Sequence, residues 1–345
     1  MKALCYLGPE TIQCDSVADP AVNNSADAVV RIRSCGICGS DLHIYHGHGF
    51  VEGSGYSVGH EAIGEVVEVG SGVRQLRVGD QVMVSGAVGC GACPACLAGH
   101  VNRCEHGAMR CYGLGTGLGG CQAEAVTVPA ADFNARRIPD GVSADQALML
   151  TDNLPTAYMA CLNADVAPGK TVVVVGLGPI GLMAVECAFI LGASRVFALD
   201  PMADRRTMAE ALGAVPLDPT VAKEAIREAT RGRMAACVIE AVGSDAALKS
   251  AIDLAGFQST VSIIGVNRDS NFQFPMNRAF FKGLTLRISA CSVQSHWADL
   301  VPLLQQGRLH PERFITHRLA LAEGAEAYRR YAAREPGVLK VLLSP

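Results

Sequence analysis

The sequence predicts an α/β protein with two domains, one β-rich and barrel-like and the other built on a doubly wound parallel sheet. The chain has 345 residues, half of them hydrophobic, which is long enough for two packed domains and short for three. Up to about residue 150, short β-branched runs are separated by Gly, Pro or Asp. From about residue 154, apolar runs alternate with segments long enough for helices.

The first part of the chain contains four runs typical of short strands, and they lie at 28–32, 62–69, 80–84 and 123–128. Runs of this length with turn residues between them predict antiparallel strands in a barrel-like domain. The tail from residue 292 has a mixed pattern and ends in a further predicted strand at 338–343. The pattern alone leaves open whether this tail rejoins the first domain.

The middle of the chain alternates between strand-like and helix-like segments. The predicted strands are 171–175, 195–199, 237–240 and 260–264, and the clearest helices are 182–191 and 203–212. Strands joined through helices form parallel sheets with helices on both faces.

Charge and composition exclude several partners. The net charge is −4 at pH 7 and no run of Lys or Arg is present, so we expect no nucleic-acid partner. The N-terminus lacks the apolar core of a signal peptide, and no stretch nears the roughly 18 apolar residues of a membrane span. We therefore expect a cytoplasmic protein without a membrane partner, whose 14 cysteines are thiols and metal ligands rather than disulfides.

A glycine motif follows the predicted strand at 171–175. Gly176, Gly178 and Gly181 have G-x-G-x-x-G spacing, with Pro179 and Ile180 before the last glycine. The first glycine permits a tight turn, the second lets backbone approach a pyrophosphate, and the third permits close packing of helix and strand. The phosphate would bind at the helix N-terminus.

An acidic residue at the end of the next strand indicates which dinucleotide binds. Asp200 lies about 20 residues beyond the motif, where a carboxylate binds the adenosine ribose hydroxyls. Its charge would repel the 2′-phosphate of NADP, so the sequence predicts NAD. Two alternatives stay open: Asp200 caps the next helix, or Arg205 or Arg206 receives a 2′-phosphate.

Four cysteines form a compact group, C-x2-C-x2-C-x7-C, at Cys90, Cys93, Cys96 and Cys104. Four thiolates close a tetrahedron around zinc and leave no open position, which is typical of a structural site. A nucleic-acid-binding zinc ribbon is the rival interpretation, but paired knuckles and a basic surface are absent from the sequence.

A catalytic zinc would need three protein ligands and an open position. Candidates occur in two segments, which hold Cys35, Cys38 and His43, and His60 with Glu61. For any one of these residues alone, a buried cysteine or a structural histidine is the ordinary explanation. Composition by itself does not assemble them into a site.

Longer motifs carry a resemblance along the whole chain. In order they are GICGSDLHIYHG, GHEAIGEVVEVGSGV, VGDQV, the four-cysteine segment, TDNLPTAY and VVVVGLGPIG. The chain resembles the zinc-containing medium-chain alcohol dehydrogenase family. The resemblance implies a GroES-like catalytic domain formed by residues 1–153 and 292–345, with a structural-zinc lobe near 90–104. A Rossmann NAD-binding domain, residues 154–291, would be inserted between them.

The resemblance also implies a catalytic zinc site. Cys38, His60 and Asp152 match the ligands, and Glu61 matches an exchangeable ligand that binds zinc when substrate is absent. Asp152 departs from the Cys2His ligand set of alcohol dehydrogenase, and it could instead cap a helix beginning near Pro155.

Further roles follow from the same resemblance. Ser40 matches the hydroxyl that takes the alcohol proton, His43 matches the group that relays it toward solvent, and Asp41 would orient His60. Thr156 and Ile180 match positions that pack against nicotinamide, Val266 is a further cofactor position, and Lys340 matches a basic residue at the pyrophosphate.

The predicted function is reversible hydride transfer from a primary or secondary alcohol to NAD with two zinc ions, one catalytic and one structural. Oxidation of a polyol or of L-threonine is the alternative within the family. A zinc-free quinone reductase is disfavoured by Cys38, His60 and Asp200, and a metal-storage or crystallin-like protein by Ser40 and His43. Because bacterial relatives are often tetramers, we expect a homo-oligomer, more often a tetramer than a dimer.

Overall fold

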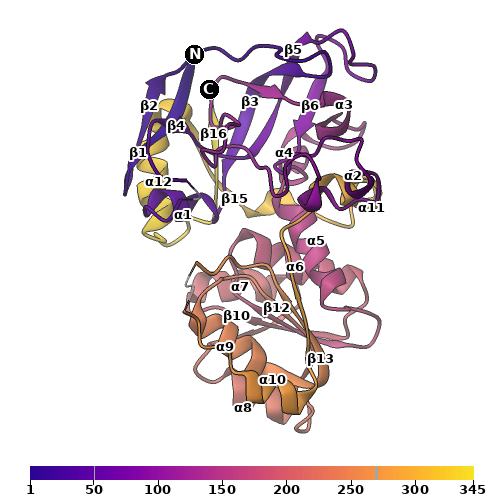
Figure 1. Ribbon diagram of the computed structural model, residues 1–345. Coiled ribbons are helices and arrows are strands. Elements are labelled where there is room, and N and C mark those ends of the chain that lie inside the picture. Colours follow the sequence, from indigo (N-terminus) through magenta and orange to yellow (C-terminus); the bar gives the residue numbers. More distant parts are fainter. Residues whose placement is uncertain (50, 269–270) are drawn as a thin grey trace. The chain divides into compact units, whose positions relative to one another are not determined.

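The computed structural model describes residues 1–49, 51–268 and 271–345 (Figure 1). The chain divides into two compact units. Unit 1 comprises Met1–Pro155 and Cys291–Pro345, and unit 2 comprises Thr156–Ala290. Both ends of the chain therefore belong to one unit, and the middle of the chain forms the other.

Unit 1 is built on two β-sheets. The larger sheet has the order β15 (Ile315–Ala320), β16 (Lys340–Ser344), β3 (Ala28–Ile37), β5 (Glu61–Val69), β6 (Gln81–Val84), β8 (Ala135–Arg137), with β7 (Ala125–Val128) paired to β3. The smaller sheet has the order β2 (Thr11–Ser16), β1 (Lys2–Gly8), β4 (Tyr56–Ser57). Apart from the parallel pair β15 and β16, neighbouring strands are antiparallel, which agrees with the β-rich prediction.

The long strand β3 organises unit 1, because β5, β7 and β16 all pair with it. Its pairing with β16 places Val341 opposite Ile37 and Leu343 opposite Cys35. All four side chains are buried, so the tail of the chain completes the apolar core of the unit. The tail thus rejoins the first part of the chain, a point that the sequence pattern left open.

Short helices connect the strands of unit 1. The α-helices are α1 (Asp41–Tyr45), α2 (Pro94–Leu97), α3 (Ala131–Asn134), α4 (Ala144–Met149), α11 (Trp297–Gln305) and α12 (Gly324–Ala332). The 3-10 turns are Val101–Arg103, Val293–His296, Pro311–Phe314 and Leu321–Glu323. Helix α5 (Asn153–Asn163) contains the junction between the two units.

Unit 2 is a six-stranded parallel sheet with helices between its strands. The sheet order is β11 (Val215–Leu217), β10 (Arg195–Leu199), β9 (Thr171–Val175), β12 (Ala235–Glu240), β13 (Ala255–Ile263), β14 (Thr285–Ile288). The helices are α6 (Pro179–Ile190), α7 (Ala203–Ala211), α8 (Ala222–Ala229), α9 (Asp245–Leu254) and α10 (Met276–Lys282). This is the doubly wound order, and chain progression reverses between β9 and β12.

Agreement with the sequence is closest in the centre of this sheet. The strands predicted at 171–175 and 195–199 coincide with β9 and β10, because these buried apolar runs are bounded by clear turn residues. The edge strands β11 and β14 were not predicted, since they are short and lack a continuous apolar run. Over the described residues, no helix combines the length and apolarity needed to cross a bilayer.

Candidate metal centres and cofactor site

Four potential metal ligands from three segments converge in unit 1. The donor atoms of Cys38, His60, Glu61 and Asp152 all lie within 4.8 Å of one another. Cys38 follows β3, His60 precedes Glu61 at the start of β5, and Asp152 precedes α5. Pairing of β3 with β5 brings the first two segments together. Thiolate, imidazole and carboxylate are the ligand types that zinc takes in proteins, so this donor set, which we call the Cys38 group, fits zinc.

Asp152 contacts two of the other candidate ligands, Cys38 and His60, directly. Its Oδ2 lies 3.4 Å from Cys38 Sγ and 3.6 Å from His60 Nε2. Burial lowers the pKa of His60, but the nearby carboxylate of Asp41 and the hydrogen bond to Asp152 outweigh it and raise the pKa well above its usual value. Burial raises the pKa of Asp152, but hydrogen bonding and the charge of His60 bring it to about 2. His60 and Asp152 thus each favour the charged form of the other.

A series of buried polar side chains fixes the ring of His60 on its Nδ1 side, away from the Cys38 group. Its Nδ1 lies 3.1 Å from Asp41 Oδ1, and the other oxygen of Asp41 accepts hydrogen bonds from Cys38 N (2.9 Å) and Gln122 Nε2 (3.2 Å). Tyr328 in turn donates its hydroxyl to Gln122 Oε1 at 2.9 Å. Such contacts fix which ring nitrogen faces a metal. The Asp41 contact was expected, whereas Gln122 and Tyr328 lie in no motif and were missed.

Glu61 is held by a fully buried cation. Its Oε2 lies 2.5 Å from Lys340 Nζ, which also donates to Ile37 O at 3.0 Å. Its Oε1 accepts a hydrogen bond from Asn153 Nδ2 at 2.8 Å. Gly36 leaves the necessary room, because a Cβ there would lie 2.1 Å from Glu61 Oε2. The sequence did not indicate this ion pair: Lys340 was expected at the cofactor pyrophosphate, a role that stays a prediction.

Asn153 is a second residue that the sequence analysis missed. Besides its bond to Glu61, its side-chain amide donates to Asp152 Oδ2 at 2.9 Å and approaches Cys38 Sγ at 3.7 Å. It is 1% exposed and starts α5. One side chain thereby orients three members of the Cys38 group, and the only signal for it was its position beside Asp152.

The two predicted proton-transfer residues flank helix α1. Ser40 directly precedes the helix, and its Oγ lies 3.4 Å from His60 Nε2. His43 lies in the helix itself and is half-buried. The hydroxyl of Ser40 is therefore beside the ring nitrogen that faces the Cys38 group, while the transfer of a proton between Ser40 and His43 stays a prediction.

The four predicted structural cysteines also come together, in a lobe around α2. Cys90 Sγ lies 4.0 Å from Cys96 Sγ, and the donor atoms of Cys90, Cys93 and Cys104 lie within 4.8 Å of one another and of His106. Backbone N–H groups donate to the sulfurs, from Cys93 to Cys90 at 3.3 Å and from Cys90 to Cys104 at 3.4 Å. Closely spaced sulfurs that accept N–H hydrogen bonds are suited to bind zinc as thiolates.

The cysteines of this lobe differ in their surroundings. A hydrogen bond from the backbone N–H of Ala92 lowers the pKa of Cys90 to about 6. Burial opposes this shift, and hydrogen bonds from Cys93 and His106 add to it. Burial instead raises the pKa of Cys96 to about 12. His106, which the sequence analysis did not consider, was signalled only by its place two residues after Cys104.

The glycine motif lies at the carboxyl end of β9. Gly176 has φ +92°, and a Cβ there would lie 2.4 Å from Val242 Cγ2. A Cβ at Gly181 would lie 1.9 Å from Gly176 O, whereas no atom lies within 4 Å of a Cβ at Gly178. Gly178 caps α6 and Pro179 begins it. The motif therefore has a tight turn and an uncovered backbone at a helix N-terminus, as an anion site requires.

Asp200 faces this motif from the end of β10. Its Oδ2 accepts a hydrogen bond from Leu177 N at 2.9 Å, and its Oδ1 accepts one from Met202 N at 2.9 Å, just before α7. Arg205 Nη1 lies 3.9 Å from Asp200 Oδ2, whereas Arg206 donates to Asp200 O at 2.7 Å. Asp200 thus adjoins the glycine loop and also orders the start of the next helix, so the two sequence interpretations are compatible.

The remaining cofactor candidates of unit 2 lie on its strand-to-helix connections and helices. Val266 follows β13, and its carbonyl oxygen would lie 2.5 Å from a Cβ at Gly243, which follows β12. Thr156 in α5 and Ile180 in α6 are half-buried. The loops after β9, β12 and β13 thus adjoin one another at the carboxyl ends of the central strands, where ligands bind in open α/β sheets.

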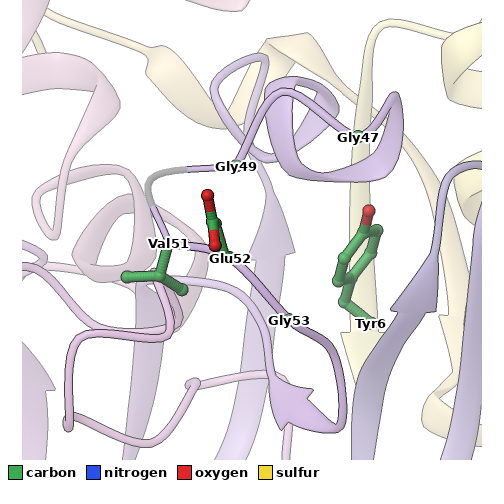
Figure 2. A pocket seen from close by; sticks show the side chains of 6 residues that line it. All are labelled: Tyr6, Gly47, Gly49, Val51, Glu52 and Gly53. Atoms are coloured by element: carbon green, nitrogen blue, oxygen red, sulfur yellow. The ribbon is translucent and has the colours of Figure 1, made fainter.

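A separate hollow of about 370 Å³ in unit 1 lies between Tyr6 and residues that follow α1 (Figure 2). The residues that line it are Tyr6, Gly47, Gly49, Val51, Glu52 and Gly53. Glu52 supplies the only charged side chain among these lining residues, and no member of the Cys38 group lines the hollow. It is therefore distinct from the candidate metal centre.

Comparison with known proteins identifies the family. Residues 24–140 match the alcohol dehydrogenase GroES-like domain, and residues 179–306 match the zinc-binding dehydrogenase domain. A "probable zinc-binding alcohol dehydrogenase" of Mycobacterium tuberculosis is 42% identical over 100% of this chain and 89% of its own length. The chain belongs to the zinc-containing medium-chain dehydrogenase family.

Two further members of this family bear on structure and substrate. The alcohol dehydrogenase of Thermus sp. ATN1 superposes with a TM-score of 0.93 at 37% identity, covering 100% of this chain and 99% of that chain. The L-threonine 3-dehydrogenase of Cronobacter sakazakii is 32% identical over 100% of this chain and 99% of its own length. Membership of the family makes the chain an oxidoreductase and confirms the predicted GroES-like and Rossmann-like folds.

Proposed function

We propose that the chain is an NAD-dependent zinc alcohol dehydrogenase that reversibly converts a primary or secondary alcohol to an aldehyde or ketone. The observation that carries the proposal is the Cys38 group with a serine hydroxyl beside it. Four donors suitable for zinc converge there, and Ser40 Oγ lies 3.4 Å from the ring nitrogen of one of them. A zinc-free reductase of the same fold has no need for such a group.

The donor sets assign the metals. Cys38, His60 and Asp152 would hold a catalytic zinc. Glu61 would be an exchangeable ligand, which pairs with Lys340 when it does not bind the metal. The four cysteines of the lobe, Cys90, Cys93, Cys96 and Cys104, would hold a structural one. A zinc ion at the Cys38 group supplies a Lewis acid that makes an alcohol more acidic. The ring of His60 is held by Asp41, so its Nε2 stays directed into the group.

The chain itself supplies the route for the proton. Ser40 accepts the proton of the substrate hydroxyl at its Oγ and releases its own toward His43. A half-buried histidine near the surface suits the outer step, because its ordinary pKa of about 6.5 lies near operating pH. Water and buffer can replace His43 in part, whereas Ser40 has no neighbour of the same chemistry among the residues placed at the group.

Asp200 supports NAD as the cofactor. Its carboxylate contacts the glycine loop, where it would bind ribose hydroxyls and repel a 2′-phosphate. Arg205 lies close enough to Asp200 to offset part of that repulsion, so we expect NAD to be preferred strongly but NADP not to be excluded.

The second candidate function is oxidation of L-threonine or a polyol. The threonine dehydrogenase relative spans the whole chain, and the Cys38 group would serve any of these substrates. Measuring NAD reduction with a panel of simple alcohols, diols, sugar alcohols and threonine separates the alternatives. The expected result is highest kcat/KM with a simple alcohol; threonine as the best substrate would favour the alternative.

The proton route is tested with Ser40→Ala and His43→Gln, measured across pH with zinc content checked in each. We expect Ser40→Ala to lower kcat severely and His43→Gln to lower it less, within or below the roughly 10²- to 10⁴-fold range of acid–base groups. His43→Gln should also weaken the limb of the pH profile near pH 6 to 7. Full activity of Ser40→Ala with both zinc ions present would contradict the route.

An apolar surface on unit 2 supports the expected homo-oligomer. Strand β14 is an edge of the parallel sheet, and Phe257, Phe280, Phe281 and Ile288 around it are each at least 68% exposed. Open apolar edges favour pairing with another chain. Analytical ultracentrifugation should give a dimer or tetramer, and Phe281→Asp should weaken assembly; a monomer at micromolar concentration would contradict the proposal.

A further inference from the structure

The cysteine lobe of unit 1 contains five potential zinc donors rather than four. His106 joins Cys90, Cys93 and Cys104 in a group whose donor atoms all lie within 4.8 Å of one another. Cys96 reaches the same sulfurs from inside the lobe, 4.0 Å from Cys90 Sγ. A structural zinc takes four ligands. Cys90, Cys93 and Cys104 can supply three of them, and Cys96 and His106 are alternatives for the fourth position.

The position of Cys96 fits ordinary zinc binding. Zn–S bonds of about 2.3 Å in a tetrahedron separate two sulfurs by about 3.8 Å, close to the observed 4.0 Å between Cys90 and Cys96. Cys96 lies in α2 and is 3% exposed. A Cβ at Gly89 would lie 2.8 Å from Cys96 Sγ, so its sulfur is confined on the protein side. The position of Cys96 therefore fits the fourth ligand of a zinc bound in the lobe.

His106 approaches from the solvent side. It lies in the turn after Cys104, where Gly107 N donates to Cys104 O at 3.2 Å. Gly107 has φ +136°, which allows the chain to fold back over the sulfurs. His106 itself is exposed, so its imidazole can move to a metal without repacking the core.

We propose that His106 is a substitute ligand of this lobe, which holds zinc with four cysteines and retains it with Cys90, Cys93, Cys104 and His106 when Cys96 does not bind. The inference rests on the proposed zinc binding of the lobe. An imidazole nitrogen is a regular partner of three thiolates in structural zinc sites.

The test compares metal content in the full-length protein after dialysis against a chelator. The variants are Cys96→Ser, Cys96→Ser with His106→Gln, and Cys96→Ser with His100→Gln. His100 is a matched control because it is exposed, lies in the same lobe and is outside the group of donors. We expect two zinc ions per chain in the first and third variants and one in the second. Equal zinc loss in all three would overturn the inference.

Cobalt identifies the ligand. In Cys96→Ser loaded with Co²⁺, replacement of one sulfur by nitrogen should weaken the sulfur-to-metal charge-transfer band and shift the visible bands, and His106→Gln should remove that spectrum. An unchanged spectrum after His106→Gln would overturn the inference. Unmodified protein with fewer than two zinc ions would instead contradict the proposed metal content, so the two failures are distinguishable.

A comparison that keeps Cys96 covers the case in which Cys96→Ser does not fold. His106→Gln and His100→Gln are exposed to the same excess chelator, and release of zinc from the lobe is followed over time. His106→Gln should release it faster by about tenfold, the lower end of the effect of supporting groups on metal affinity. Equal release rates in the two variants would overturn the inference.

Discussion

The buried ion pair between Glu61 and Lys340 gives the sharpest prediction for stability. The two side chains are 1% and 0% exposed, and their charged atoms lie 2.5 Å apart. Burial lowers the pKa of Lys340, but the charge of Glu61 outweighs it and raises the pKa above its usual value. The lysine is therefore an ammonium at pH 7. Replacing it with methionine keeps most of the length of the side chain and removes the charge.

The expected loss can be estimated from this geometry. With an effective dielectric constant of about 20, unit charges 2.5 Å apart attract by about 7 kcal/mol, whereas desolvation costs several kcal/mol per ion. The pair as a whole therefore contributes little. Removing one partner leaves an uncompensated buried charge, which costs about 3–5 kcal/mol. For a unit of this size the loss corresponds to a drop in Tm of roughly 10 °C.

Thermal unfolding of three variants tests the estimate. Lys340→Met and Glu61→Gln should each lower Tm strongly, while the double variant should recover most of the loss because no lone charge remains. The control is Arg329→Gln, which breaks an exposed ion pair of 2.6 Å with Glu326 and should change Tm little. If Lys340→Met behaves like the control, the reasoning is refuted. Zinc content is measured in each, since Glu61 belongs to the Cys38 group.

Three further results are expected. Cys93→Ser should remove one of two zinc ions and lower stability, whereas Cys38→Ser should remove the other and abolish turnover with the fold retained; metal analysis and circular dichroism distinguish them. Asp200→Gly should erode the preference of kcat/KM for NAD over NADP, and equal values in the unmodified protein would contradict its role. A hydrogen bond from Arg287 lowers the pKa of Asp165, so this pair stabilises the fold above the ordinary aspartate pKa of about 3.9, and the benefit is lost as pH falls below it. Arg287→Gln should therefore cost less than about 1 kcal/mol at pH 7, because both groups are exposed and screened, and less at low pH, where Asp165 is protonated; a constant difference in stability across pH would contradict this.

Local patterns in the sequence predicted the local parts of the fold. The predicted bounds of the central strands β9 and β10 agree with the structure at both ends, because turn residues flank these buried apolar runs. The glycine motif predicted a tight turn at Gly176, and the structure has one there, with φ +92°. The four cysteines of the lobe were also found from the sequence, because ligands that share one loop are close together along the chain.

Contacts between distant segments were beyond reach. The pairing of β16 with β3 and of β3 with β5 brings Lys340 to Glu61, and this depends on which strand is next to which. Gln122 and His106 belong to no motif, and Asn153 lies in TDNLPTAY but had no role assigned to it. Their contacts with the two metal groups became visible only in three dimensions. Asp152, named as a ligand through resemblance, had a second explanation as a helix cap, and only the structure shows that it lies beside Cys38 and His60.

The sequence by itself determined the class of chemistry: a glycine turn for a dinucleotide, thiols for zinc, and the family motifs that connect them. The tertiary structure decided which charged and polar groups surround those residues. The physical reason is that ligand type and turn geometry are properties of single residues and short segments. The pairing of Glu61 with Lys340 and the orientation of His60 arise from packing, which brings together groups that lie up to hundreds of residues apart.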